Sequence, residues 1–342
     1  MHCLTQRSMK INMNVPSGFL KTNYLRMKRG ITLAWIIILY FNFLYAQQTR
    51  QYTQYMFNQF GHNPAVAGSK ECMDIKTGYR LQWMGFEGAP KTGYLSFQSR
   101  LKQKQKKPDQ PYHGIGLYLE NDQVGPIGTT YIYPAYAYHI PLNKGYTLSG
   151  GVFAGVQQYT FDNNLTLFNP VDNAIGALEN VWIFPDITAG LWLYHESLYA
   201  GLATGQLFNK LIKGPGGQIG INSLIERHYN FTAGYRFLLG ENQSLIPSTM
   251  VKFIPLAPPS IDMNVMWDYE NLFTLGVSYR NVDAVAVLAK FSLFSFLDVA
   301  YSFDYTTSKI RKGSSNSHEI MLSLYLCEGK LRTAAGICPA YY

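Results

Sequence analysis

Charged side chains recur at every second position along several segments of this 342-residue chain. In residues 71–85, Asp74, Lys76 and Arg80 alternate with apolar or aromatic residues, and residues 260–270 and 296–306 repeat the pattern. A period of two puts the two sets on opposite faces of a β-strand. Charged faces inside a barrel would form either a network of ion pairs or a conducting or ligand-binding lining. Their mixed signs favour the network, because a selective pore carries a ring of one sign. The predicted inward-facing set is Asp74, Lys76, Arg80, Gln98, Arg100, Glu120, Arg236, Asp262, Asp268, Glu270, Arg280, Lys290, Asp298, Asp304 and Glu319.

The remaining reactive residue types form no arrangement that is typical of an enzyme. The sequence contains no His-Glu-x-x-His zinc motif, no Gly-x-Ser-x-Gly nucleophile elbow and no phosphate-binding loop. The cysteine spacing does not match a zinc site. A hydrolase would require isolated Ser, His and Asp residues to meet in space. We therefore expect no enzymatic activity, no cofactor and no metal.

Two of the four cysteines are candidates for a disulfide. Cys72 and Cys327 fall at the start of the first and at the end of the last predicted strand, and both are expected on the inner face. Closure of a barrel makes these two strands neighbours, so a bond across the junction is geometrically possible. A bond between Cys327 and Cys338 and unbridged cysteines are the alternatives. Cys3 precedes the segment that we expect to be removed.

The composition favours an all-β protein as the framework for these residues. Aromatic residues make up 15% of the chain and charged residues only 15%, with 26 Tyr and 30 Gly. The mean hydropathy of −0.08 argues against a bundle of membrane helices. We predict fourteen strands at residues 71–85, 91–101, 112–122, 128–142, 146–160, 184–194, 197–207, 227–239, 244–255, 260–270, 272–280, 284–293, 296–306 and 318–326.

The predicted strands are typical of a transmembrane β-barrel in the outer membrane. They are about ten residues or longer with aromatic ends, and an even number closes without a free edge. Short turns near residues 143–145, 195–196, 240–243, 271 and 294–295 should be periplasmic. Long loops at about 161–183, 208–226 and 307–317 should be extracellular, and those at 161–183 and 208–226 are candidate partner surfaces. The charged loop at residues 102–111 is the exception, because it is long and falls on the periplasmic end; it is either a solvated turn or a docking site for a periplasmic partner.

The N-terminal region is expected to be a leader. Residues 31–45 are largely apolar, follow Lys28 and Arg29, and precede Ala46, which predicts a signal peptide at 27–46 with cleavage near Ala46. Residues 1–26 would then be an upstream extension; a genuinely long leader or a membrane anchor is the alternative. Six of the 29 Lys and Arg residues, and no acid, lie in residues 1–46, which leaves the remainder a net charge of +2. This small net charge gives no indication that the protein binds nucleic acid. Residues 47–70 would form a short periplasmic segment, 71–328 the barrel and 329–342 a tail.

Three ordered blocks of sequence carry a family resemblance. They read Gln54-Tyr-Met-Phe-Asn58, Asn63-Pro-Ala-Val-Ala-Gly-Ser69 and Gly78-Tyr-Arg-Leu-Gln-Trp-Met-Gly-Phe-Glu-Gly-Ala-Pro-Lys-Thr92. Together they resemble the opening of the PorP/SprF family, which are outer-membrane proteins of the type IX secretion and gliding machinery of Bacteroidetes. Residues 317–325 resemble the last strand of that family more loosely.

The resemblance implies an accessory of type IX secretion that works by binding and anchoring. The implied partners are outer-membrane lipid, type IX secretion components and a large secreted adhesin with a C-terminal sorting domain. The motif residues are candidates for partner docking, although a purely structural rim turn is the alternative for those around Trp83. They are Asn58, Asn63, Pro64, Gly68, Tyr79, Arg80, Trp83, Gly85, Phe86, Gly88, Pro90 and Lys91.

A passive channel for hydrophobic or small solutes is the second hypothesis. Its support is the tripeptide Asn63-Pro-Ala65, which is similar to the N-terminal signature of FadL-type channels.

Overall fold

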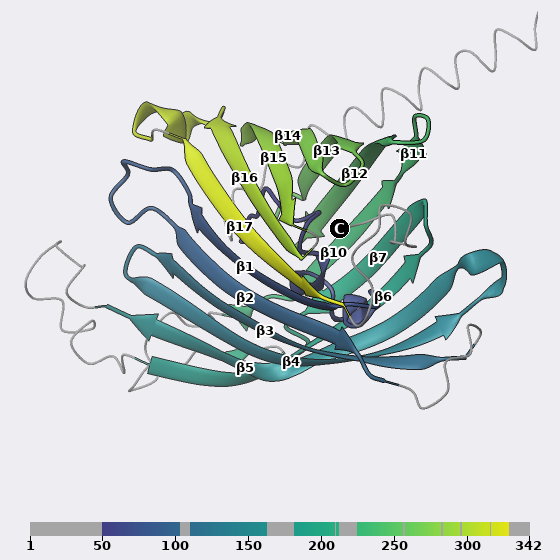
Figure 1. Ribbon diagram of the computed structural model, residues 1–342. Helices are drawn as coiled ribbons and strands as arrows, with labels where there is room; N and C mark the ends of the chain where they lie inside the picture. Colours follow the sequence, from purple (N-terminus) through teal and green to yellow (C-terminus); the bar gives the residue numbers. More distant parts are fainter. Residues whose placement is uncertain are drawn as a thin grey trace, which may run out of the picture. The chain divides into compact units, whose positions relative to one another are not determined.

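The computed structural model describes residues 50–102, 110–162, 181–208, 210–211, 224–255, 257–281, 283–294, 296–314 and 316–327. It is a closed antiparallel barrel of fourteen strands, as the alternation predicts (Figure 1). The strands are β1 (Met73–Leu81), β2 (Lys91–Arg100), β3 (Tyr112–Val124), β4 (Ile127–Pro141), β5 (Thr147–Phe161), β6 (Val181–Tyr194), β7 (Leu198–Gly205), β10 (His228–Tyr235) with its continuation β11 (Phe237–Leu238), β12 (Gln243–Phe253), β13 (Ser260–Tyr269), β14 (Phe273–Arg280), β15 (Ala284–Phe294), β16 (Leu297–Thr306) and β17 (Ser317–Leu326). A separate short pair, β8 (Lys210–Leu211) and β9 (Leu224–Ile225), lies between β7 and β10 in the sequence.

The barrel closes where β1 pairs with β17. This junction, here called the seam, aligns Met73 with Leu326 and Leu81 with His318. The observed strand ends lie within a few residues of the predicted ones. The largest difference is at the end of β1, which stops at Leu81 because Trp83 and Gly85 adopt left-handed backbone conformations with φ of 51° and 88°. Within the described residues, no helix has the length and apolar character needed to cross a membrane.

The two faces of the wall have opposite character. In β13, Asp262, Asn264 and Asp268 are buried, whereas Met263 and Val265 are exposed by 56% and 43%. The same alternation runs around the barrel, so the outer face is apolar and suited to lipid and the inner face is polar. The predicted inward-facing set is buried in the structure except for Arg100, Arg236 and Glu270, which are partly exposed.

The loops distinguish the two ends of the barrel. Short turns join β4 to β5, β6 to β7, β11 to β12, β13 to β14 and β15 to β16, and β1 begins and β17 ends at the same end. We assign this end to the periplasm and the other to the cell exterior, because outer-membrane barrels have short periplasmic turns. The connection between β2 and β3 is at the periplasmic end, because β2 ends and β3 begins there. The strand count from the sequence therefore placed this connection correctly, although it is longer than the other periplasmic turns.

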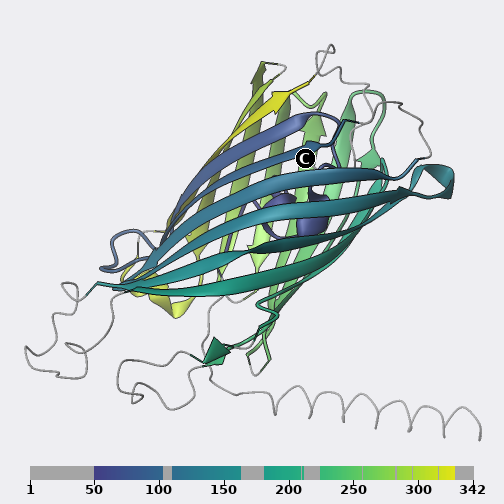
Figure 2. The same ribbon diagram turned by 90° about the horizontal axis from the view of Figure 1, so that it is seen from below.

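Residues 50–70, here called the plug, lie inside the barrel (Figures 1 and 2). The plug contains two short 3₁₀ turns, η1 (Gln59–Gly61) and η2 (Pro64–Val66). This position differs from the predicted one, a periplasmic segment in front of the barrel. The physical reason is its aromatic content: Tyr55, Phe57 and Phe60 are each 1% exposed, and the Phe60 ring packs against Tyr118 and Phe153 of the wall, which removes apolar area from water.

Candidate functional site: the plugged lumen and the extracellular rim

The plug touches the wall through backbone atoms where the wall carries glycine. A Cβ atom added to Gly151 on β5 would lie 2.6 Å from Cα of Ala65, and one added to Gly114 on β3 would lie 1.9 Å from the Ala67 carbonyl oxygen. Real Cβ atoms cannot approach so closely, so glycine is required at both positions. On the plug side, Gly68 has a φ of +74° and faces Gly114. The η2 turn is therefore seated in a glycine-lined part of the wall.

Side chains of the wall and plug fix this seat by hydrogen bonds. Asn63 accepts a bond from the Ala65 amide at 3.0 Å, which caps η2, and its amide donates to the Leu191 carbonyl of β6 at 2.9 Å. Ser149 donates to the Ala65 carbonyl at 2.6 Å, and Nε2 of His139 lies 2.7 Å from the Ala67 carbonyl oxygen. Because Pro64 and its neighbours are buried, each of these bonds satisfies a group that has no access to bulk water.

A cluster of five buried charged residues binds the first half of the plug. Arg80 lies 2.7 Å from Asp304 and 3.0 Å from Glu319, and Arg280 lies 2.7 Å from Asp262 and 3.5 Å from Asp304. Charges buried this deeply are tolerated only when they are paired and hydrogen-bonded.

Thr53 of the plug lies at the centre of this cluster. Its hydroxyl donates to Asp304 at 2.6 Å and accepts from Arg80 at 2.9 Å and from Arg280 at 3.3 Å. Its amide donates to Glu319 at 2.8 Å. One plug residue thus joins charged groups from β1, β14, β16 and β17.

The N-terminal end of the plug lies towards the cell exterior. Arg50 pairs with Glu120 near the extracellular end of β3, and its guanidinium lies 3.8 Å from the centre of the Tyr131 ring. Lys252, near the extracellular end of β12, donates to the Arg50 carbonyl at 2.8 Å. The plug therefore runs through the lumen from the extracellular half at Arg50 to the start of β1 at the periplasmic end.

His62 lies among aromatic rings of the plug. Its ring makes edge contacts with the rings of Tyr52 and Tyr55, at 5.4 Å and 6.5 Å between centroids. Burial, reinforced by the positive charges of Lys252 and Arg50, holds the pKa of His62 well below its ordinary value. An imidazolium at this position would repel both cations, so the neutral form is the one that suits the docked plug.

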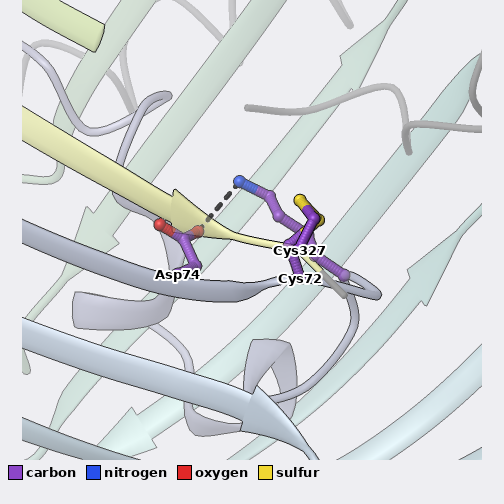
Figure 3. Close-up of a disulfide and its surroundings, with 4 residues drawn as sticks. Cys72, Asp74 and Cys327 are labelled. Carbon is purple, nitrogen blue, oxygen red and sulfur yellow. Dashed lines mark hydrogen bonds and ion pairs between the residues drawn. A yellow bond between two sulfur atoms is a disulfide. The ribbon is translucent and has the colours of Figure 1, made fainter. Parts of the chain in front are cut away.

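A disulfide fixes the periplasmic end of the seam. Cys72, two residues before Asp74, is bonded to Cys327, which directly follows β17, and their Cα atoms are 4.5 Å apart (Figure 3). Asp74 beside the bond pairs with Lys70 at 3.0 Å and Lys76 at 3.2 Å. The bond therefore joins the first and last strands at the point where the plug enters β1. The alternative partner, Cys338, lies outside the described residues.

We expect Cys72→Ser to lower the free energy of unfolding by about 2–4 kcal/mol, since the bond closes a very long loop. Urea unfolding in detergent measures this loss, and reduction of the wild type should reproduce it. Mass spectrometry of unreduced peptides provides the direct check. Peptides that join Cys72 to Cys338, or free thiols at both positions of the seam, would contradict the pairing.

The turn between β1 and β2, residues 82–90 and here called the rim turn, is fixed to both of its neighbours. The Trp83 amide donates to the Ser317 hydroxyl at 3.0 Å, and the Met84 amide donates to the Asn316 carbonyl at 2.8 Å. On the other side, the Gly125 amide donates to the Gly88 carbonyl at 2.9 Å. These bonds make the rim turn a rigid part of the extracellular end.

A family model described as type IX secretion system membrane protein PorP/SprF matches residues 44–324. The chain belongs to the PorP/SprF family. It is therefore an outer-membrane component of type IX secretion, as the three sequence blocks imply. No curated protein matches the chain.

The solved structures that are similar to this PorP/SprF chain include a hydrocarbon channel, a toluene transporter and a FadL homologue. The CymD monoaromatic hydrocarbon channel is 11% identical with a TM-score of 0.48, and the match covers 80% of this chain and 94% of that one. The Ralstonia pickettii toluene transporter TbuX is 9% identical with a TM-score of 0.48, over 78% and 92% of the two chains. A Pseudomonas aeruginosa FadL homologue is 12% identical with a TM-score of 0.46, over 80% and 93%.

The structure divides the predicted PorP/SprF motif residues among three places. Asn58, Asn63, Pro64, Gly68 and Arg80 are inside the barrel, where they hold or form the plug. Tyr79 is on the outer face of β1 and is 48% exposed. Trp83, Gly85, Phe86, Gly88, Pro90 and Lys91 form the rim turn and the start of β2.

The motif therefore does not form one docking surface. Phe86 and Met84, which are 55% and 38% exposed, are the large apolar side chains of the rim turn that a partner can reach.

Several residues of the site are absent from the sequence-based prediction. Thr53 joins the plug to the charged cluster, His139 and Ser149 bind the plug from the wall, and Gly114 and Gly151 make room for it. The two glycines could have been identified from the sequence, because an isolated Gly within a strand pattern indicates that another backbone segment approaches closely. Among the described residues, no group of three or more His, Cys, Asp or Glu side chains is placed to hold a metal ion.

Proposed function

We propose that this PorP/SprF barrel assists a cognate large secreted adhesin with a C-terminal sorting domain, either during passage across the outer membrane or in staying on the cell surface. It would act by binding and without catalysis. Family membership supports the secretion context. The plug supports a binding role, because residues 50–70 occupy the lumen and leave the rims as the surfaces that a partner can reach.

The rim turn supports binding at the extracellular end. Its hydrogen bonds to residues 316–317 and to Gly125 hold it in one conformation. A pre-organised loop binds with less loss of conformational entropy than a mobile one. The exposed Phe86 is the apolar anchor that such a loop would present.

The test compares the surface and culture-medium proteomes of the native strain and an in-frame deletion, with a complemented strain as the control. Loss of one large sorting-domain protein from the surface is the result that we expect for a dedicated partner. Loss of all sorting-domain proteins would instead identify core machinery. If no such protein changes, the secretion role fails for this chain. Solute uptake by the purified barrel in liposomes would then favour the passive channel.

A further inference from the structure

The loop between β16 and β17 concentrates positive charge on the extracellular rim. Its 3₁₀ turn η5 (Lys309–Lys312) carries Lys309, Arg311 and Lys312, all of which are exposed, and residues 307–316 contain no acid. In the described part of the chain, none of the ion pairs involves these three side chains. The turn thus presents three cations to its surroundings.

The turn folds over the outside of the wall. The guanidinium of Arg311 lies 4.6 Å from the centre of the Tyr305 ring. Tyr305 alternates with the buried residues Asp304 and Thr306 and is 40% exposed, so it belongs to the outer, lipid-facing side of β16. Arg311 is therefore placed at the level where the lipid-facing surface meets the head groups, away from the lumen.

An apolar row continues from this point along the outer face. Tyr305 pairs with Val285 of β15, which pairs with Tyr279 of β14, and all three side chains are exposed. Acyl chains of the outer leaflet can lie on this row while a charged head group reaches the turn. Aromatic side chains with basic neighbours are the usual arrangement at a membrane interface.

Two nearby acids do not neutralise the turn. Asp283 lies 3.6 Å from Arg280 and faces the interior with a side chain that is 17% exposed. Glu87 is in the rim turn next to Phe86, and Phe86 approaches Gly313 of the basic loop. Three cations therefore face one exposed carboxylate.

We propose that Lys309, Arg311 and Lys312 bind the phosphate groups of an anionic glycolipid in the outer leaflet. Guanidinium and ammonium groups are the preferred protein ligands of phosphate. The stacking of Arg311 on a lipid-facing tyrosine selects a lipid phosphate over a soluble one, because the acyl chains and the phosphate are then bound by adjacent surfaces. It also disfavours an acidic protein partner, which would approach from above the lumen.

The test measures lipid binding by the purified full-length barrel in detergent with native mass spectrometry. The probes are diphosphorylated lipid A, the same lipid without phosphates, and inorganic phosphate. The variant is Lys309→Gln/Arg311→Gln/Lys312→Gln. The matched control is Lys144→Asn/Arg227→Gln, which removes exposed cations elsewhere and leaves a residue suited to the φ of 63° at position 144. Heat-modifiable migration on gels verifies that each variant is folded.

We expect the triple variant to bind diphosphorylated lipid A on the order of a hundredfold more weakly, since each cation at an anionic membrane surface contributes roughly fivefold. The control variant should bind like the wild type, and the wild type should prefer the phosphorylated lipid. Equal binding by the triple variant and the wild type would overturn the proposal. So would complete competition by an equal concentration of inorganic phosphate, which would indicate a plain anion site. Loss of adhesin retention in the triple variant with unchanged lipid binding would instead identify a protein-docking surface.

Discussion

Replacing Gly151 by leucine is expected to displace the plug and make the barrel conduct ions, whereas the same change at Gly150 should leave it closed. At Gly151 the new side chain would collide with the backbone of Ala65, 2.6 Å away, and backbone cannot move aside locally. At Gly150 the nearest atom is a methyl group of Leu191 at 3.7 Å, on the outer face. The two substitutions are neighbours in sequence and identical in chemistry, so the difference between them isolates the plug.

The measurement is single-channel conductance in a planar lipid bilayer. The wild type and Gly150→Leu should show no steps. Gly151→Leu should show open-channel steps, because an emptied barrel of fourteen strands approaches the size of the porins, whose 16–18 strands enclose an aqueous channel. A deletion of residues 51–69 should conduct in the same way and serves as the reference for an empty lumen. Protease sensitivity of the plug reports its displacement independently.

The opposite result has a clear meaning. If Gly151→Leu is folded, conducts nothing and keeps its plug protected from protease, then the glycine contact does not hold the plug. If the deletion variant is folded and closed as well, side chains of the wall alone seal the lumen.

Arg80→Met is expected to destabilise the folded barrel by about 3–5 kcal/mol, since it leaves buried carboxylates without their cation. Arg80 is 1% exposed, bonds Asp304 and Glu319, and donates to Thr53 of the plug. Methionine fills a similar volume without charge, so the loss reports the charge and its hydrogen bonds more than the packing. Urea unfolding in lipid vesicles, followed by tryptophan fluorescence, measures the difference.

A second substitution tests whether the unpaired carboxylate causes the loss. Glu319→Gln in the Arg80→Met background should restore part of the stability, because it removes one buried negative charge while keeping an acceptor for the Thr53 amide. Lys91→Ala, at an exposed site near the extracellular end of the barrel, is the matched control and should change the free energy of unfolding little. If Arg80→Met behaves like Lys91→Ala, the cluster is not important for stability.

The wall of the barrel was predictable because its signal is local. The alternation of polar and apolar residues at Asp262, Met263 and Asn264 indicates that the segment is a strand and which of its sides faces inward. The membrane then requires the apolar side to face outward. Closure then made Cys72 and Cys327 neighbours without any further information, although a Cys327–Cys338 bond and unbridged cysteines remained alternatives in the sequence. The turn chemistry of Gly85 and Gly88 likewise indicated the rim turn, and both adopt positive φ.

The plug was not predictable in the same way. Residues 50–70 have no regular period, and their position depends on tertiary contacts with strands that follow far along the chain. Asn63 illustrates the difference: its sequence context marked it as a docking candidate, whereas its amide bonds Leu191, which is 128 residues away. Arg80 was correctly placed on the inner face, but nothing local indicated that Thr53 would meet it.

The glycine contacts between wall and plug have a consequence for evolution. A plug transferred from one family member to another would fit only if the facing wall positions kept the same space, as Gly114 does for Ala67 and Gly151 for Ala65. A larger residue at Gly114 or Gly151 cannot be accepted alone, so a change there requires a compensating change in the plug. Recombination that changes the binding partner is therefore easier at the rim loops than within residues 50–70. The rim loops can be replaced without disturbing the interior. The inside of the molecule should be inherited as a unit while its surface diversifies.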